Sequence, residues 1–179
     1  NIHGTDNTVL GYCAGHSNTY GLRATFIGNE AGRNHTTAAN NTGVGNLAML
    51  KTTSGAQNTA LGGYALICNT TSGENTAIGY AALYANTAGC NTALGNRTLC
   101  NNTTGHSNVA VGRNSMQANT TGCYNNAVGL ESLRTNTSGC NNNAIGSYAL
   151  CSNTTGCNNN AFGDAALCSN TVGEHNIGV

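Results

Sequence analysis

A 17-residue repeat runs through the whole chain. Each copy contains a glycine preceded by an apolar residue, and successive key glycines lie 17 residues apart, except for one interval of 16 between Gly79 and Gly95. The copies fill all 179 residues and leave no room for a second domain. We therefore predict a single repeat array over residues 1–179, as part of a longer chain. The key glycines are Gly11, Gly28, Gly45, Gly62, Gly79, Gly95, Gly112, Gly129, Gly146 and Gly163.

The length and composition of the repeat favour a β-solenoid. Helical solenoids need about 30 residues or more per unit, and an NTTG cluster in every copy would break helices. The consensus N-T-A-h-G-x-x-A-L-x-x-N-T-T-G-x-x, where h is apolar, offers two short strands, one at N-T-A-h and one at the A-L segment, joined by Asn- and Gly-rich turns. We predict an all-β, parallel β-solenoid of about ten coils, stacked about 4.8 Å apart.

The columns of the repeat predict which side chains fill the interior. Four residues after the key glycine most copies carry Leu or Met, although the first two copies have Gly15 and Gly32 there. Equivalent residues of stacked coils lie above one another, so these side chains would form a continuous stripe. The predicted core stripe comprises Leu66, Leu83, Leu99, Met116, Leu133, Leu150 and Leu167.

Each coil offers few large apolar side chains, so we expect partner chains or cross-links to support the array. Nine cysteines occur, and none forms a CxxC pair, so disulfides in an oxidising, extracellular setting are favoured over a metal site. The spacing predicts disulfides between neighbouring coils, within or between chains; the alternative is nine free, buried thiols. The predicted pairs are Cys90–Cys100, Cys140–Cys151 and Cys157–Cys168.

Other chemistry is sparse in this sequence. Only 7% of the residues are charged and the net charge is zero, which disfavours binding to nucleic acid or to an anionic membrane. No apolar run approaches the ~18 residues of a membrane span. The acids are dispersed, so we predict no carboxylate pair, catalytic site, cofactor or metal site. The histidines share no column and are predicted to lie scattered on the surface: His3, His16, His35, His106 and His175.

Two polar columns suggest specific roles. Sequons recur seven residues after the key glycine and predict either N-glycosylation or simple turn chemistry. The candidate glycosylation sites are Asn69, Asn102, Asn119, Asn136 and Asn153. A second column resembles the threonine row of ice-binding β-solenoids, but it changes to Val109, Asn126, Asn143 and Asn160 in the later copies. Its threonines are Thr8, Thr25, Thr42, Thr59, Thr76 and Thr92.

The phrase NTAIGYAALYANTAGCNTALG, residues 75–95, resembles repeats of phage and bacterial tail-fibre proteins and of large cell-surface proteins. It is more distantly similar to the head repeats of trimeric autotransporter adhesins. The resemblance covers every copy, and it implies left-handed parallel β-rolls, a homotrimer or filament, and a place at the cell or virion surface. It also implies a cell-surface or glycan target. The cysteines depart from this pattern.

From these patterns we expect a structural, non-catalytic segment of an extracellular fibre or adhesin that associates with its own copies. Two alternatives remain open at this point. One is an ice-binding β-solenoid, and the other is a monomeric surface-layer or matrix component.

Overall fold

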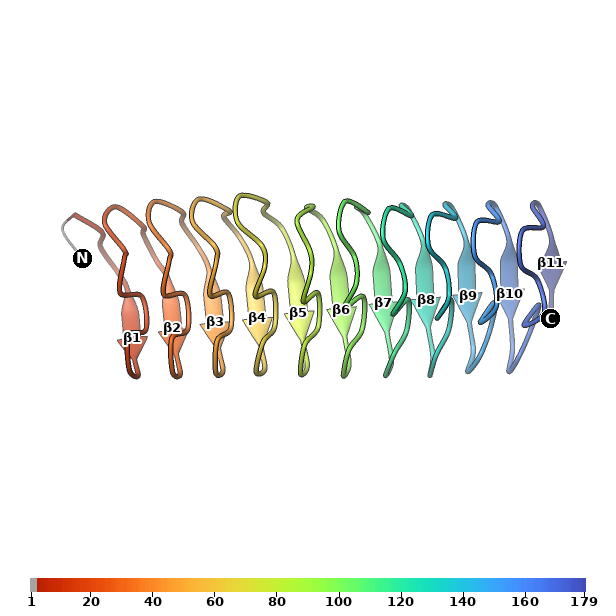
Figure 1. The fold of residues 1–179 in the computed structure, drawn as a ribbon, viewed down its shortest axis with the longest axis horizontal. Coiled ribbons are helices and arrows are strands. Elements are labelled where there is room, and N and C mark those ends of the chain that lie inside the picture. The colour runs from red at the N-terminus through yellow and green to blue at the C-terminus, as the bar shows by residue number, and fades with distance from the viewer. Residues whose placement is uncertain (1–2) are drawn as a thin grey trace.

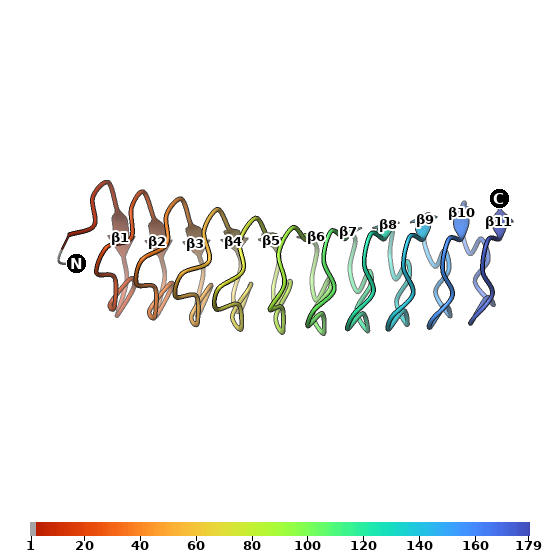
Figure 2. The same cartoon turned by 90° about the horizontal axis from the view of Figure 1, so that it is seen from above.

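The computed structural model describes residues 3–179 and confirms the all-β, parallel solenoid. The coils stack along one axis, with β1 and β11 at opposite ends (Figure 1), and the same order is seen from above in Figure 2. Eleven strands form one sheet in sequence order. They are β1 (Thr8–Leu10), β2 (Thr25–Ile27), β3 (Thr42–Val44), β4 (Thr59–Leu61), β5 (Thr76–Ile78), β6 (Thr92–Leu94), β7 (Val109–Val111), β8 (Asn126–Val128), β9 (Asn143–Ile145), β10 (Asn160–Phe162) and β11 (Ile177–Gly178).

Each coil contributes one strand in the same register as its neighbours. The middle residue of the strand faces the interior, as Ala60 and Ala77 do, while the first and third residues face outward. The 16-residue coil keeps this register, because Thr76 still pairs with Thr92. Its missing residue falls in the turn between Asn86 and the next glycine, so the strands are undisturbed.

The second predicted strand, at the A-L segment, is not formed. These residues lie in turns, and two of them in each coil have positive φ: Ala81 has a φ of 54° and Leu83 a φ of 51°. A left-handed conformation is incompatible with an extended strand. The segment nevertheless bonds to both neighbouring coils, because Ala81 N donates to Gly63 O at 3.0 Å and Leu83 N donates to Thr98 O at 3.1 Å.

The predicted core stripe lies inside the coils. Six of its seven side chains are fully buried, and Leu167, in the last coil, is partly buried against the same cluster. The alanines from the middle of the strands line the opposite wall of this apolar half of the interior. Removal of apolar surface from water therefore occurs in every coil, along one continuous column.

In the second coil, the large and the small core residue have changed places relative to the later coils. Phe26 occupies the middle of β2, where most strands have Ala, and it is fully buried. A Cβ on Gly32 would collide with the Phe26 ring, and one on Gly43 would lie 3.0 Å from that ring. Gly32 stands at the position where later coils have Leu or Met, and the Phe26 side chain fills that space from the strand.

The other half of the interior is polar and consists of two buried asparagine ladders. The turn ladder begins the NTTG turns, and the strand ladder directly precedes the strands. In the strand ladder, Asn125 Nδ2 donates to Asn108 Oδ1 at 3.2 Å and to Gly139 O at 2.8 Å. Buried amides are tolerated because they are hydrogen-bonded. The strand ladder comprises Asn41, Asn58, Asn75, Asn91, Asn108, Asn125, Asn142, Asn159 and Asn176, and the turn ladder comprises Asn86, Asn102, Asn119, Asn136, Asn153 and Asn170.

Candidate functional site

Four outward positions of the repeat, all at one corner of the rod, vary strongly between coils. The strand, the core stripe and the asparagine ladders are nearly constant, whereas the positions one, two, five and six residues after the key glycine change from coil to coil. We call these four positions the variable corner. They carry every Lys and Arg of the chain except Arg23. In a solenoid, constant positions build the scaffold and variable outward positions are free to recognise a ligand.

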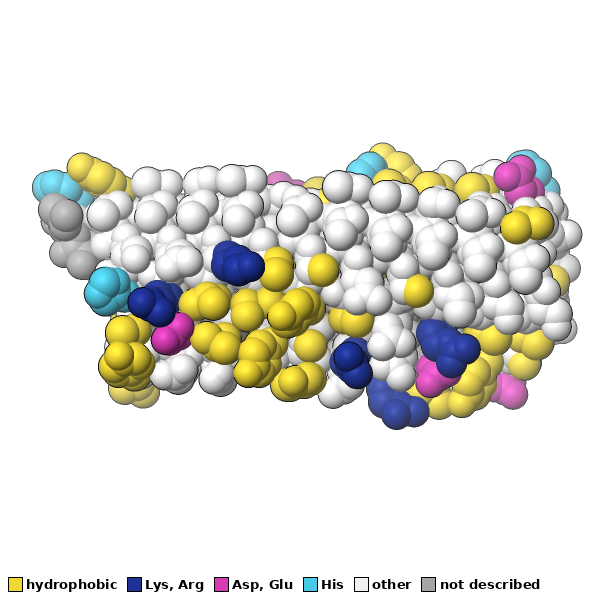
Figure 3. Space-filling model, in the orientation of Figure 1, with side chains coloured by type: hydrophobic (Ala, Val, Ile, Leu, Met, Phe, Trp, Pro, Cys, Tyr) yellow, Lys and Arg dark blue, Asp and Glu magenta, His cyan; other side chains and the backbone are white. Residues whose placement is uncertain are grey.

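The variable corner carries an aromatic patch in the middle coils. Figure 3 shows hydrophobic side chains gathered over the lower part of β2 to β5, bordered by basic side chains. Tyr64 and Tyr80 pack edge to face, with ring centroids 5.6 Å apart, and Tyr80 and Tyr84 are 54% and 41% exposed. A shallow depression of about 240 Å³ is lined by Tyr80, Ala81, Tyr84, Arg97, Cys100 and Asn101. Exposed tyrosines combine an apolar ring with a polar hydroxyl, which suits a binding surface.

The charges of the variable corner are only partly paired. Glu131 contacts Arg134 at 2.9 Å and Arg113 at 3.9 Å, and Glu30 contacts Arg33 in the same way at 3.2 Å. Lys51 and Arg97 make no ion pair within residues 3–179, and both are exposed. The aromatic patch is therefore flanked by two cations available to a negatively charged or hydroxyl-rich partner.

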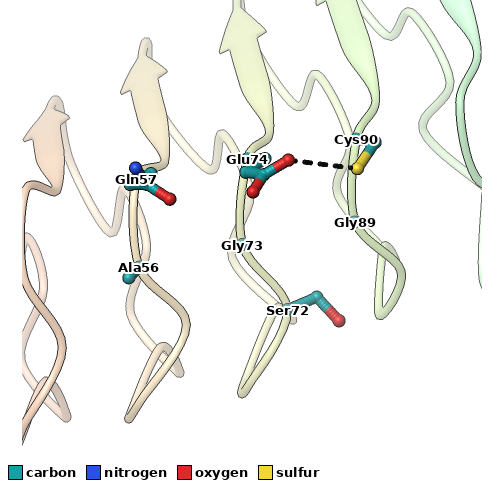
Figure 4. A pocket seen from close by; sticks show the side chains of 7 residues that line it. All are labelled: Ala56, Gln57, Ser72, Gly73, Glu74, Gly89 and Cys90. Carbon is teal, nitrogen blue, oxygen red and sulfur yellow. Dashed lines mark hydrogen bonds between the residues drawn. The ribbon is translucent and has the colours of Figure 1, made fainter.

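A second depression, of about 340 Å³, lies at the 16-residue coil. It is lined by Ala56, Gln57, Ser72, Gly73, Glu74, Gly89 and Cys90 (Figure 4). Cys90 Sγ donates a hydrogen bond to Glu74 Oε2 at 3.4 Å, and this bond raises the pKa of the exposed Cys90 thiol. A thiol held in its protonated form is a weak nucleophile. This depression therefore shows no activated cysteine.

The missing residue also changes the column of Cys90. Counting from the key glycine groups Cys90 with Cys123, but the turn that follows Asn86 is one residue shorter than the others. Gly89 stacks on Gly73 as a result, and Cys90 stacks beside Glu74. Sequence counting therefore assigned Cys90 to the wrong column.

The structure does not bring the predicted disulfide partners together. All nine cysteines are free thiols. Cys90 and Cys100 line different depressions. Cys140 and Cys157 are in hydrogen-bond contact with each other, and Cys151 contacts Cys168. Cysteines therefore meet within a column, whereas the predicted pairs required contacts between two different columns.

The candidate glycosylation sites are buried. All five asparagines have no exposed surface, and four of them donate from Nδ2 to the turn-ladder asparagine of the preceding coil. Asn69 donates from the same atom to Ser72 O at 2.8 Å. A glycan is attached at this nitrogen, and the folded coil has no space for one. The structure therefore favours the turn-chemistry interpretation and argues against glycosylation of the folded array.

His35 corrects the prediction of surface histidines. It occupies the turn-ladder column and is fully buried, with its ring 4.9 Å from that of Phe26. Asn41 Nδ2 donates to His35 Nε2 at 3.1 Å, so Nε2 is the unprotonated nitrogen. Burial lowers the pKa of His35 to about 4. Its position seven residues after Gly28, shared with the ladder asparagines, was the signal in the sequence.

Acidification is expected to destabilise the array through His35. The folded state keeps His35 neutral down to a pKa of about 4, whereas the unfolded chain binds the proton near 6.5. The contribution of neutral His35 to the free energy of unfolding is therefore fully present above pH 6.5. It is lost as the pH falls from 6.5 to 4, which lowers the free energy of unfolding by about 3 kcal/mol. Urea unfolding at pH 7.5 and pH 4 measures the loss. His35→Asn, which restores the ladder residue, should lose less, and equal losses in both proteins would contradict this assignment.

Residues 3–179 contain no cluster of three or more His, Cys, Asp or Glu side chains that could hold a metal ion. Within the same residues, no helix has the length and apolar character to cross a membrane. Comparisons with protein-family models, with curated proteins and with solved structures found no match.

Proposed function

We propose that this chain is a structural segment of an extracellular fibre, that it assembles with its own copies, and that it contacts a cell-surface or glycan target through the variable corner. The observation that carries the proposal is an aliphatic column on the outer face of the sheet. It is formed by the third residue of each strand and extends along the whole rod. The column consists of the aliphatic residues Leu10, Ile27, Val44, Leu61, Ile78, Leu94, Val111, Val128 and Ile145, and it ends at the aromatic Phe162.

This column supports association between copies because it is apolar, continuous and accessible. Ile145 and Phe162 are each 44% exposed, and the in-register pairing places every member beside the next. Large exposed apolar surfaces are typical of interaction sites. Few charges stand against such contact, since only 7% of the residues are charged. A homotrimer or a filament would cover the column along its length.

Attachment to a target is supported by the variable corner. The rings of Tyr80 and Tyr84 offer flat apolar faces, and beside them lies the guanidinium of Arg97, which makes no ion pair within residues 3–179. This combination suits a saccharide or an acidic surface group. We place the protein outside the cell because its nine cysteines lack the CxxC spacing of a metal site and suit an oxidising compartment. The proposal includes no catalytic step.

Self-association is tested by measuring mass and shape in solution. Light scattering over a dilution series, together with electron microscopy of the same samples, should show oligomers or filaments. Ile145→Lys should dissociate them, because it places a charge in the aliphatic column. Asn143→Lys is the matched control, since it adds the same charge to the same outer face of β9 outside that column. A monomeric rod at all concentrations would refute assembly.

Ice binding is a second candidate, favoured by one observation. The threonines that begin β1 to β6 lie in register beside the aliphatic column, on a single sheet. In the later coils the row becomes asparagine, where Asn126 Nδ2 donates to Asn143 Oδ1 at 2.8 Å. A thermal-hysteresis measurement decides between the candidates: an ice-binding protein would show hysteresis as a monomer, and a fibre segment would show none.

A further inference from the structure

Cys123, Cys140 and Cys157 lie in one column on three consecutive coils. Each precedes a strand-ladder asparagine by two residues, so the hydrogen bonds of that ladder fix the relative heights of the three cysteines. Neighbours contact each other directly. Cys123 N donates to Cys140 Sγ at 3.1 Å, and Cys140 N donates to Cys157 Sγ at 3.1 Å.

This arrangement meets the distance requirement of a disulfide. In-register coils lie about 4.8 Å apart, and disulfide-bonded cysteines have Cα atoms about 4.4–6.8 Å apart. Each thiol now donates only to the carbonyl two residues earlier, as Cys123 Sγ does to Thr121 O at 3.2 Å. Thiols are weak donors, so rotating one toward its neighbour loses little. All three are partly exposed and can be reached by a small oxidant.

We propose that this column is a site of oxidative modification that forms one disulfide, Cys123–Cys140 or Cys140–Cys157, and leaves the third thiol free. A small disulfide such as oxidised glutathione is the oxidant. One protein thiolate attacks it, forms a mixed disulfide and releases one glutathione. The neighbouring thiolate then attacks the protein sulfur and releases the second glutathione. Two protein thiols thereby lose two electrons and two protons, which the small disulfide receives.

The pairing follows a rule, which we call the column rule: two cysteines in one column on adjacent coils can form a disulfide. This rule predicts one other disulfide. Cys151 and Cys168 share the column five residues after the key glycine, on adjacent coils, and Cys151 Sγ lies 3.7 Å from Cys168 O. The remaining cysteines have no cysteine one coil away in their own column: Cys13, Cys68, Cys90 and Cys100. Of the nine thiols, two disulfides use four, so five stay outside protein disulfides. The three disulfides predicted from the sequence would leave three.

The pairing is tested on the folded chain in a glutathione redox buffer. After denaturation and alkylation without reductant, mass spectrometry should count five thiols that are alkylated or carry one glutathione. Trypsin then separates the cysteines, since Cys123 lies in fragment 114–134 and the four later cysteines lie in 135–179. A Cys123–Cys140 disulfide joins these fragments, whereas Cys140–Cys157 and Cys151–Cys168 are internal to the second and are located by fragmentation of that peptide. Nine alkylated thiols, or a Cys140–Cys151 link, would overturn the proposal.

Two serine variants separate the middle cysteine from an outer one. In Cys140→Ser the remaining cysteines of the column are two coils apart, about 9.6 Å, too far for a disulfide. Of its eight thiols, one disulfide uses two, so six should stay outside protein disulfides. Cys123→Ser keeps the Cys140–Cys157 pair, so four of its eight thiols should stay outside protein disulfides. Equal counts in the two variants, with the fold retained by circular dichroism, would refute the column rule.

Discussion

Gly62→Ala is expected to destabilise the array by at least about 4 kcal/mol, which is in the range of the most disruptive single substitutions. Gly62 has a φ of 133°, a conformation that residues with a Cβ avoid. A Cβ built on it would lie 2.6 Å from Gly79 O and 2.7 Å from Gly79 C in the next coil. Neither atom can move aside without separating the coils, so backbone strain and collision add together.

Gly63→Ala provides a matched control in the next residue. A Cβ there meets its nearest neighbours, Tyr80 Cδ2 and Asn46 O, at 3.7 and 3.8 Å, and Gly63 has no positive φ. We expect its unfolding free energy to stay within about 1 kcal/mol of the native value. Urea unfolding followed by circular dichroism measures both variants. Similar losses in the two proteins would show that the key glycines are not required by coil-to-coil contact.

Asn125→Ala is expected to cost about 4 kcal/mol, because it opens the strand ladder in the middle of the rod. Asn125 Oδ1 accepts bonds from Asn142 N at 3.0 Å and from Asn142 Nδ2 at 3.1 Å, while Asn125 Nδ2 donates to Asn108 and Gly139. The substitution leaves several buried polar groups without partners, each at a cost of about 1–3 kcal/mol. The costs of these separate groups are not additive, so the expected total is smaller than their sum.

Asn126→Ala is the control for this ladder. Asn126 follows Asn125 directly but faces outward, and its side chain donates only to Asn143 Oδ1 in an exposed position. Water can replace that partner, so we expect a change of less than about 1 kcal/mol. Hydrogen exchange on the coils of Asn108 and Asn142 would add a local measurement. Protection lost there in Asn125→Ala alone would show that the ladder couples neighbouring coils.

The sequence predicted those features of the fold that repeat identically. A column of identical residues reports a shared environment, and this was sufficient for the strand register, the parallel sheet and the buried stripe that includes Leu133 and Leu150. It was not sufficient for backbone conformation. Leu83 looks like a strand residue in the consensus, yet it has a left-handed φ of 51°, which residue type and spacing do not reveal. The tertiary stacking outweighs the local preference of this segment.

The site residues were harder to predict because they depend on departures from the repeat. The column of Cys90 depends on which turn of the 16-residue coil is shortened. The interval between Gly79 and Gly95 shows that one residue is missing, but not from which turn. The burial of Asn136 and its sequon relatives depends on the winding of the turn. His35 could have been recognised from its column, since asparagines in the equivalent positions make the ladder. The aromatic patch depends on stacking, which brings Tyr64 beside the coil of Tyr80 and Tyr84, 16 and 20 residues later in the chain.

The turn after Asn86 shows where this rod can be altered. One residue is missing there, and yet β5 and β6 pair in the same register as every other pair of strands. Length at this point is uncoupled from the stack, so a peptide epitope or a fluorescent label grafted beside Thr87 would project from the rod and leave its repeat intact. The same graft made in several coils would display the epitope or label at regular multiples of about 4.8 Å along the rod.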